Sequence, residues 1–528
     1  MKNSFSGPVR SAVVLTLAAL VAGVSGTAMA QTRASQERVI VEFKPGKLKA
    51  ARAAIQAAGG RVVLDLSEDN AVAAVLPAGK RLALRRNAAV ASIDDDPIRT
   101  VMGSRKATVR RAGASAAVMS TEVVPFGIPM VQADQVAYGS TRKVCVIDSG
   151  YDLSHEDLQK TGVTGQNFTT EGDWSTDENQ HGTHVTGTIA ALGGNGVGVV
   201  GVVPGGNLNL YVAKVFDSTG SAASSTIMKG VRACKRAGAN VVNMSLGGGR
   251  PTNFEAKTYQ RFYDSGMLII AAAGNAGTSA LSYPASYPSV VSVAAIDVNK
   301  AKADFSQFNA EVEIAGPGVA TLSTVPTGSN REATLSVGGA SFAAAPMDGS
   351  PVGSASAALY NFGTGEVDDA GVAGKVCLIA RGNISFADKV LRCQANGGVA
   401  AVIYNNTAGQ LFGTMNGVVT TIPSMGVSDV DGAALLGQVG AVASAAVAVS
   451  AYNYAEFNGT SMATPHVAGV AALVWSNFPA CGPARIREAL NATAQDLGAA
   501  GRDVEFGFGL VQAKAAADWL ATNGCAAP

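Results

Sequence analysis

The chain has 528 residues, 47% of them apolar, and its 40 basic and 39 acidic side chains nearly cancel to a formal net charge of +1. Because only 15% of the residues are charged and neither sign dominates, the composition gives no indication of a nucleic-acid or polyanionic partner. A chain of this length predicts several domains rather than one.

The first segment, residues 1–30, has the pattern of a secretory signal peptide. Lys2 and Arg10 precede an apolar stretch at 12–24, and Ala28-Met29-Ala30 matches the small-residue motif of a cleavage site. The apolar stretch is too short to span a membrane. We therefore expect the mature protein to be secreted, extracellular or periplasmic, without a membrane anchor.

Residues 37–99 have the alternating pattern of a small α+β unit. Strands are predicted at 39–43, 59–66, 71–76 and 90–93, and helices at 48–58 and 78–87. Two β-α-β halves in this order form a ferredoxin-like unit. The segment from Arg99 to Arg111 has five basic residues and no acidic ones, and 112–119 are small and apolar, so residues 100–121 are predicted as an exposed, cleavable linker.

A candidate acid–base pair follows the linker. The β-branched run 143–147 predicts a buried parallel strand, with Asp148 just past its end, where open α/β sheets build their sites. A buried carboxylate needs a hydrogen-bond donor, and a histidine N–H is a suitable one. His181 begins a run of small and apolar residues that predicts a buried helix. His181 and His184 are three residues apart, whereas the helical zinc motif has its two histidines four apart with a glutamate between them. A zinc site at these two histidines is therefore not expected.

Other motif-like features are interpreted as structural. Residues 196–201 match the glycine pattern of dinucleotide-binding loops, but that pattern should follow a strand and open a helix. Here it follows the predicted His181 helix and continues into Val202-Val203-Pro204, so no nucleotide site is expected. We expect His184 and His466 to pack within helices and His155 to lie in a loop.

Ser461 is the candidate nucleophile. The run 463–474 is apolar all round, which predicts a buried helix with Ser461 at its N-terminus and Pro465 in its first turn. A serine hydroxyl needs an adjacent base and a group that orients the base, and a helix N-terminus favours an oxyanion. Alone, Ser461 would be interpreted as a helix cap. Together with Asp148 and His181 it completes an acid, base and nucleophile.

Three motifs in this order resemble those of the subtilisin-like serine proteases, the subtilases. They are Val146-Ile147-Asp148-Ser149-Gly150, His181-Gly182-Thr183-His184-Val185 and Gly459-Thr460-Ser461-Met462-Ala463-Thr464-Pro465-His466. The resemblance implies a doubly wound, mainly parallel α/β sheet and peptide hydrolysis through a Ser461 acyl-enzyme. It makes His181 the general base and acid, and Asp148 the group that orients it. The alternative is a catalytically inactive binding protein on the same scaffold.

The resemblance also implies residues that hold the substrate. Asn275, within Ala272-Ala273-Gly274-Asn275-Ala276-Gly277, corresponds to the side-chain donor of the oxyanion hole. Ser245, Leu246 and Gly247 belong to a glycine-rich edge that pairs with the backbone of a peptide substrate. Ser282 aligns with the floor of the pocket for the residue before the cut, and its small uncharged side chain suggests large or apolar substrate residues there.

No cofactor for catalysis is implied, but a structural calcium is. Its ligand set in the family corresponds here to Asp157, Glu122, Asn195, Val197 and Val199. The loop is one residue longer than the usual form, and Glu122 replaces an amide. Oxygen ligands of this kind suit a hard cation. The alternative is a solvated loop without metal.

The domain organisation implied by the resemblance has four further parts. The unit 37–99 resembles an inhibitory propeptide, which makes the chain an autoprocessed zymogen with its own propeptide as an intramolecular inhibitor. The catalytic domain comprises 122–328 and 453–517, and 518–528 form a C-terminal tail. Residues 331–451 interrupt the catalytic domain with a strand–helix–strand pattern that resembles an inserted protease-associated domain.

Export permits disulfide bonds among the six cysteines, which allow 15 pairings. Cys377 and Cys393 lie in one strand–helix unit of the insertion, and Cys481 and Cys525 could tie the tail to the core. Cys145 and Cys234 are left either as a pair or as two buried thiols.

Overall fold

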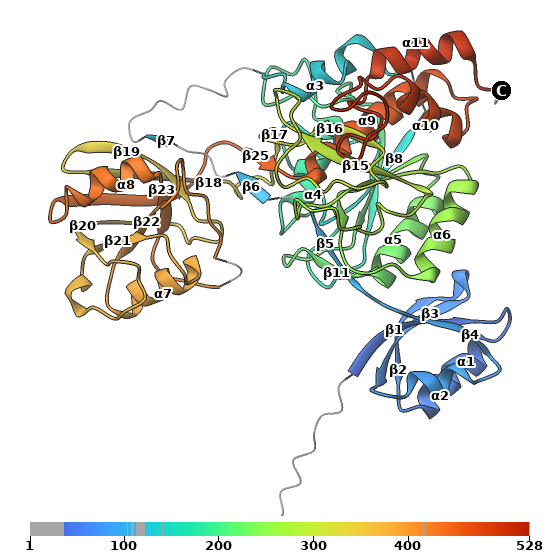
Figure 1. The fold of residues 1–528 in the computed structure, drawn as a ribbon, viewed down its shortest axis with the longest axis horizontal. Coiled ribbons are helices and arrows are strands. Elements are labelled where there is room, and N and C mark those ends of the chain that lie inside the picture. The colour runs from blue at the N-terminus through green and yellow to red at the C-terminus, as the bar shows by residue number, and fades with distance from the viewer. Residues whose placement is uncertain are drawn as a thin grey trace, which may run out of the picture.

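The computed structural model describes residues 36–102, 104–106, 110–111, 122–139, 141–415 and 418–526 (Figure 1). The predicted signal peptide, 1–30, lies outside the described residues. Three bodies are visible: a small N-terminal sheet, a large central α/β body and an inserted sheet beside it (Figure 1). Among the residues described, no helix has the length and apolar character needed to cross a membrane.

A seven-stranded sheet in the order β16-β15-β14-β12-β8-β10-β9 forms the centre of the large body. Its strands are β8 (Lys143–Asp148), β9 (Val163–Asn167), β10 (Asn209–Lys214), β12 (Val241–Met244), β14 (Leu268–Ala272), β15 (Val290–Ile296) and β16 (Ile314–Pro317). Every neighbouring pair is parallel. The predicted doubly wound, mainly parallel fold is therefore confirmed.

Helices cover both faces of this sheet. They are α4 (His181–Ala190) and α9 (Thr460–Asn477) on one face, and α5 (Ser224–Arg236) and α6 (Asn253–Asp264) on the other. Along β8, Val144 and Val146 join the first core, whereas Cys145 and Ile147 join the second. A strand buried on both faces must be apolar throughout, which explains its sequence. The Cys145–Cys234 disulfide links β8 to α5.

The C-terminal helices show that one predicted boundary is wrong. Helices α10 (Pro483–Ala492) and α11 (Ala513–Asn523) pack outside α9. The predicted tail, 518–528, begins within α11, because Leu520 is buried in the catalytic core and keeps the helix on it. A disulfide between Cys481 and Cys525 fixes the end of this segment.

The N-terminal unit contains the predicted strands and helices. It comprises β1 (Gln36–Phe43), α1 (Leu48–Ala57), β2 (Arg61–Leu66), β3 (Ala71–Pro77), α2 (Arg81–Arg85) and β4 (Val90–Asp95), in the antiparallel sheet order β2-β3-β1-β4. The second helix is shorter than the predicted 78–87. Gly79 adopts a φ of 78°, a turn conformation that delays the start of the helix.

This unit docks on the ends of α5 and α6. Ile40, Leu66 and Ala71 share a core with residues of both helices. The Asp96 carboxylate accepts hydrogen bonds from Ser225 N (2.8 Å) and Ser225 Oγ (2.6 Å), in the first turn of α5. In the same way Asp94 Oδ2 accepts from the backbone N of Phe254 (3.0 Å) in the first turn of α6. Carboxylates satisfy the free N–H groups and the positive dipole end of a helix.

Short strands connect the N-terminal unit with the central and inserted bodies. They are β5 (Ile98–Val101), β6 (Ser104–Lys106), β7 (Arg110–Arg111), β11 (Ser221–Ala223), β13 (Leu246–Gly247), β17 (Thr321–Thr324) and β25 (Tyr454–Asn458). Strand β5 lies between β11 and β13, and β6 pairs with β25. The described parts of the predicted linker thus pair with both larger bodies: β5 and β6 with the central body, and β7 with β19 of the insertion.

The strands of the insertion and β7 together form an eight-stranded sheet in the order β18-β24-β20-β21-β22-β23-β19-β7. The insertion contains β18 (Arg331–Val337), β19 (Ala340–Pro346), β20 (Gly353–Asn361), β21 (Val376–Ala380), α7 (Phe386–Ala395), β22 (Ala400–Tyr404), β23 (Ser424–Val427), α8 (Asp429–Leu436) and β24 (Val442–Val449). Arg331 and Val449 are register partners, so the two ends of the insertion lie together. The Cys377–Cys393 disulfide joins β21 to α7.

Candidate active site

The structure brings the predicted acid and base together. Asp148 is the last residue of β8 and His181 the first of α4. His181 Nδ1 lies 2.8 Å from Asp148 Oδ1, and both side chains are buried. Because an ionised carboxylate can only accept, Nδ1 carries the proton in this pair and Nε2 is free to act as a base. Ser149 N also donates to Asp148 Oδ1 at 2.8 Å.

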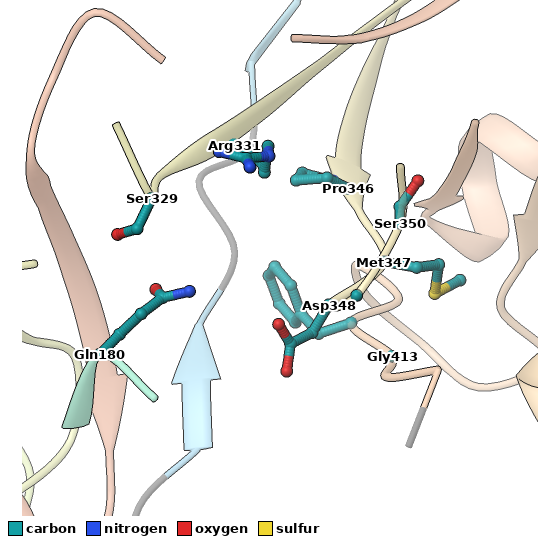
Figure 2. A pocket seen from close by; sticks show the side chains of 10 residues that line it. Gln180, Ser329, Arg331, Pro346, Met347, Asp348, Ser350 and Gly413 are labelled. Atoms are coloured by element: carbon teal, nitrogen blue, oxygen red, sulfur yellow. The ribbon is translucent and has the colours of Figure 1, made fainter. Parts of the chain in front are cut away.

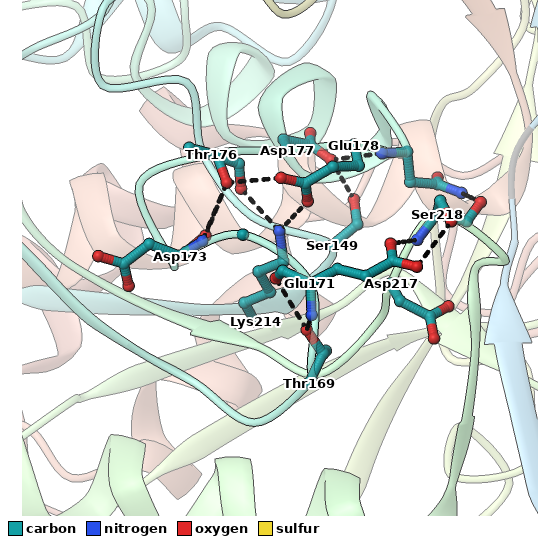
Figure 3. Close-up of polar contacts among 12 residues, drawn as sticks. Ser149, Thr169, Glu171, Asp173, Thr176, Asp177, Glu178, Lys214, Asp217 and Ser218 are labelled. Carbon is teal, nitrogen blue, oxygen red and sulfur yellow. Dashed lines mark hydrogen bonds and ion pairs between the residues drawn. The ribbon is translucent and has the colours of Figure 1, made fainter.

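A second buried aspartate, Asp177, supports this pair and was missed in the sequence. Its Oδ1 accepts from Ser149 Oγ at 2.8 Å (Figure 3). Its Oδ2 accepts from Thr183 N and Thr183 Oγ1, both at 2.8 Å. Burial raises the pKa of the Asp177 carboxyl. The signal that could have found it is an acidic residue shortly before a predicted helix, a common capping position. Asp177 therefore fixes the start of the His181 helix against the Asp148 strand.

Lys214 holds the loop that carries Asp177. Its side chain is fully buried at the end of β10, where it is the register partner of Asp148. Its Nζ donates to the Thr176 carbonyl (3.0 Å) and forms an ion pair with Glu178 (Figure 3). The loop before His181 is thus attached to the sheet edge by a charge as well as by backbone contacts.

Ser461 lies in the first turn of α9, completely buried. Its Oγ donates to the Ser245 carbonyl at 2.7 Å. His181 Nε2, the atom expected to accept the serine proton, is buried and has no hydrogen-bond partner among the described residues. In this arrangement the serine hydroxyl is hydrogen-bonded to the Ser245 carbonyl rather than to the base.

The position of Pro465 corrects one prediction. Helix α9 begins at Thr460, so Pro465 lies in its second turn rather than its first. A proline there cannot donate to the carbonyl one turn earlier, which belongs to Ser461. Ser245 Oγ supplies the missing donor at 2.8 Å. The Ser245 side chain therefore supports the nucleophile helix.

Strand β5 occupies the predicted substrate-binding edge. It pairs antiparallel with β13, with Leu246 opposite Val101 and Gly247 opposite Thr100, and with β11 on its other side. Thr100 and Val101, expected in an exposed linker, are instead a strand between two edges. The prediction was wrong because the two unpaired edges offer backbone partners to any extended segment.

Met102, directly after β5, is held at the candidate catalytic centre. Its carbonyl oxygen accepts hydrogen bonds from Asn275 Nδ2 (2.6 Å) and Ser461 N (3.1 Å), and its N–H donates to the Ser245 carbonyl (3.2 Å). Asn275 Oδ1 in turn accepts from Thr460 N at 2.9 Å, which fixes the orientation of the amide. Two donors on one carbonyl oxygen are the arrangement expected of an oxyanion hole, since they would favour negative charge that develops there.

The Met102 side chain lies in the pocket predicted for the residue before the cut. A Cβ added to Gly247 would stand 2.9 Å from the Met102 methyl carbon and 2.8 Å from Ser282 Oγ. Ser282 Oγ accepts from Gly248 N at 3.1 Å and is therefore tied to the pocket wall. The small residue at 247 leaves room for an unbranched apolar side chain.

The remaining histidines are structural, as expected. His184 stacks on Phe457 with ring centroids 4.1 Å apart, and desolvation lowers its pKa to about 3. Burial lowers the pKa of His466 to about 4, and its Nδ1 lies 2.8 Å from the Met462 carbonyl within α9. His155 lies in a loop, with Nε2 2.9 Å from the Asn453 carbonyl. Each of these two helical histidines contacts backbone carbonyl groups, which fits a packing role.

The loop predicted to bind calcium is closed by hydrogen bonds. Asp157 Oδ1 accepts from Asn195 Nδ2 (2.7 Å) and Oδ2 from Val199 N (2.8 Å), while Glu122 Oε1 accepts from Gly194 N (2.7 Å). Desolvation raises the pKa of Asp157 to about 7. Within the part of the chain that the structure describes, no three His, Cys, Asp or Glu side chains form a metal-binding group. As arranged, these residues fit a hydrogen-bonded loop better than a calcium cage.

A cavity of about 300 Å³ lies beside the site, between the central body and the insertion. Gln180, next to His181, and Ser329 lie on one side of it, whereas Met347 and Asp348 of the insertion lie on the other (Figure 2). The insertion therefore approaches the rim of the candidate active site without placing a side chain among the groups described above.

Comparisons with known proteins agree with this geometry. Subtilisin DY of Bacillus licheniformis is 43% identical over 214 residues, which cover 39% of this chain and 76% of the relative. Subtilisin NAT of Bacillus subtilis subsp. natto is 36% identical over 328 residues, covering 60% and 80%. The crystal structure of the psychrophilic subtilisin-like protease Apa1 from the Antarctic psychrotroph Pseudoalteromonas sp. AS-11 is similar over 77% of this chain and 100% of that chain, with a TM-score of 0.55 and 40% identity.

The model of the subtilase family matches residues 139–350 and 349–509, which is more than half of the chain. The matched region contains Asp148, His181 and Ser461, together with the seven-stranded parallel sheet that positions them. The chain therefore belongs to the subtilase family and is a serine endopeptidase.

Proposed function

We propose that the chain is a zymogen that cleaves its own backbone between Met102 and Gly103 and then hydrolyses other proteins and peptides. The observation that carries this proposal is the Met102 carbonyl, which accepts hydrogen bonds from Asn275 Nδ2 (2.6 Å) and Ser461 N (3.1 Å). A carbonyl bound by these two donors is polarised for attack, and the nucleophile expected to attack it is the hydroxyl of Ser461 itself.

In the proposed mechanism Ser461 Oγ leaves the Ser245 carbonyl and donates to His181 Nε2. As Oγ attacks the Met102 carbonyl carbon, the serine proton passes to Nε2, and Asp148 stabilises the imidazolium through Nδ1–H. Asn275 and the Ser461 N–H bind the oxyanion. The imidazolium then protonates the amine of Gly103, which leaves, and water hydrolyses the acyl-enzyme. The reaction needs only side chains and water, and no cofactor.

The N-terminal unit is proposed to inhibit the enzyme after this cut. Strand β5 fills the edge between β11 and β13, and the unit as a whole docks on α5 and α6, so a second peptide cannot enter until the unit leaves. The alternative, an inactive binding protein on the same scaffold, is disfavoured because acid, base, nucleophile and oxyanion donor are all present. Labelling of Ser461 by a serine-directed phosphonate separates the two.

Export is part of the proposal. The pattern at 1–30 predicts a signal peptide, and the three disulfide bonds suit an oxidising compartment, either extracellular or periplasmic. A structural calcium at Asp157 stays a prediction of the family resemblance, and no step of the mechanism depends on it.

The test is to determine both products of maturation. Purified precursor should release an N-terminal fragment whose mass corresponds to a chain ending at Met102, and a large fragment whose N-terminal sequence begins at Gly103. Later trimming of the large fragment would not alter the C-terminus of the small one. A mature protein that begins at Gln31, or a small fragment that ends at another residue from the outset, would contradict the proposal.

A further inference from the structure

Arg99, the fourth residue before the Met102–Gly103 bond, is enclosed by the catalytic body although it belongs to the segment to be removed. Only 1% of its surface is exposed. Its Nη2 lies 2.5 Å from Glu255 Oε2 and 2.9 Å from the Arg250 carbonyl oxygen, and its Nη1 donates to the Gly248 carbonyl. The guanidinium thus has one carboxylate and two backbone carbonyls as partners.

Glu255 belongs to the catalytic body, and its side chain does not make the helix-capping hydrogen bond that its sequence position predicts. Thr252-Asn253-Phe254-Glu255 is a capping-box sequence, in which the glutamate side chain normally returns to the backbone N–H of the cap residue. The first half of the motif is present, since Glu255 N donates to Thr252 Oγ1 at 3.1 Å. However, Thr252 N donates to the Tyr287 hydroxyl instead, at 2.8 Å. The carboxylate of Glu255 is therefore left available to the pocket.

Enzyme side chains hold this carboxylate in place. Ser224 Oγ donates to Glu255 Oε1 (2.5 Å), and the Tyr287 hydroxyl donates to Oε2 (2.8 Å). Glu255 is itself only 1% exposed and stands in the first turn of α6, whose dipole favours an anion. These supports come from the catalytic body alone, so they persist after Arg99 leaves.

The backbone around the guanidinium is shaped to admit it. Gly249 has a φ of +70°, and a Cβ added there would stand 2.5 Å from Arg99 Nη1. A glycine at this position lets the turn approach the side chain closely and direct carbonyl groups at it. A planar fork of N–H donors matches a carboxylate flanked by carbonyls better than the single ammonium group of lysine.

We propose that Glu255 forms a substrate subsite that selects arginine at the fourth residue before the cleaved bond. The inference rests on the proposed function, because it treats Arg99 as bound in the manner of a substrate residue. Arginine gives the buried carboxylate an ionic partner. A leucine at this substrate position would displace water from the Glu255 carboxylate without supplying new hydrogen bonds to it. A glutamate there would place a second negative charge beside it.

The test uses mature wild-type enzyme and four peptides of the form Xaa-Thr-Val-Met-p-nitroanilide, in which Xaa is Arg, Lys, Leu or Glu. The Thr-Val-Met part copies residues 100–102. We expect kcat/KM for the arginine peptide to exceed that for the leucine peptide by about tenfold or more, with lysine between them and glutamate lowest. Values for arginine and leucine within about twofold of each other would overturn the inference.

The matched variant is Glu255→Leu, expressed together with Arg99→Leu. The second change prevents a buried Arg99 from losing its carboxylate partner in the precursor. Titration of Ser461 with a serine-directed phosphonate counts the competent molecules, which separates changed selectivity from failure to fold. We expect the ratio of arginine to leucine cleavage to fall below one. A titratable variant that keeps the arginine preference would overturn the inference, since the preference would then arise elsewhere. Failure of the wild type to cleave any of the peptides or to be labelled would contradict the proposed function, and this inference with it.

Discussion

The N-terminal unit and the insertion are both additions to the catalytic body, but they are attached in different ways. Ile40, Leu66 and Ala71 of the N-terminal unit share one core with α5 and α6. The two apolar clusters of the insertion contain only residues of the insertion itself. The first addition is therefore bound as a partner, whereas the second is packed as an independent body.

Charges reinforce this difference. Asp69 of the N-terminal unit forms ion pairs with Arg232 and Arg261, and Asp94 and Asp96 satisfy the first turns of α6 and α5. The insertion is joined through a neck where Asn330 Nδ2 donates to the Tyr454 carbonyl oxygen at 2.8 Å. The N-terminal unit, as the proposed inhibitor, must recognise the enzyme, but an inserted body only has to leave the two chain ends close together.

The largest expected effect tests whether the contact at Met102 is catalytic. Ser461→Ala should lower peptide hydrolysis by at least about 10⁴-fold, because serine, histidine and aspartate act as one unit. The variant should accumulate as the precursor with its N-terminal unit attached, as seen on a denaturing gel. His181→Ala should behave in the same way. A variant of either kind that matures normally would mean that the bound segment is not a substrate of its own chain.

A smaller loss is expected for the oxyanion donor. Asn275→Ala removes one of the two hydrogen bonds to the Met102 carbonyl and should lower kcat by about 10²–10³-fold with little change in KM. Self-cleavage, followed by the appearance of the Gly103 N-terminus, should slow in proportion. If KM rises while kcat is unchanged, Asn275 binds the ground state and the assignment to the oxyanion hole is wrong.

The attachment of the N-terminal unit can be tested with the fragment 31–102 added to mature enzyme. Asp96→Ala in the fragment should raise the inhibition constant by about tenfold, since it removes a charged cap from α5. Asp95→Ala is the matched control, because the Asp95 carboxylate pairs with Arg81 inside the unit. Equal losses for the two variants would show that the caps contribute no recognition.

The insertion should tolerate removal better. Replacing 331–451 by a short Gly/Ser linker is expected to keep hydrolysis of small chromogenic peptides within about tenfold, a barrier change of about 1.4 kcal/mol. Cleavage of large proteins should change more, because β6 and β7, which follow the Met102–Gly103 bond, pair with β25 and with β19 of the insertion. A shortened enzyme that is folded yet inert toward small peptides would show that the insertion helps to build the site.

The smallest effect is expected for a substitution of Asp157, which lies next to the neck of the insertion. Its neighbour Glu156 accepts a hydrogen bond from Asn453 there. The pKa of Asp157 is raised from 3.8 to about 7, so the folded state holds a proton that the unfolded state releases between these values. Stability should therefore fall as the pH rises from about 4 to 7. In EDTA, Asp157→Asn should remove this dependence and melt a few degrees above the wild type at pH 8.

Calcium sharpens the same experiment. If Asp157 binds calcium, the metal should raise the melting temperature of the wild type at pH 8 and leave Asp157→Asn unchanged, because a cation stabilises the ionised carboxylate. Equal melting temperatures of the wild type in calcium and in EDTA would exclude the predicted calcium site, in agreement with the hydrogen-bonded loop.

The sequence by itself determined the catalytic body. Residues 144–147 are apolar because both faces of their strand are buried, and the residues that follow, Asp148 and Ser149, mark the edge where the site forms. The motifs around His181 and Ser461 identify the chemistry because few side-chain sets activate a serine. The N-terminal strands and helices also followed from local periodicity, although β1 and β4 extend beyond their predicted ends and α2 is shorter than predicted.

Only the tertiary structure decided what fills the cleft. Arg99 and Glu255 are 156 residues apart, and nothing in either local pattern indicates that they pair. The segment around Met102 was predicted as a linker because basic and small residues follow it, whereas in the structure β5 pairs with the edges of β11 and β13. Similarly, the donor that replaces the lost hydrogen bond of Pro465 comes from Ser245, which is distant in sequence. Contacts between unpaired edges, buried charges and orphaned carbonyls depend on which elements the fold brings together, and a local pattern does not contain that information.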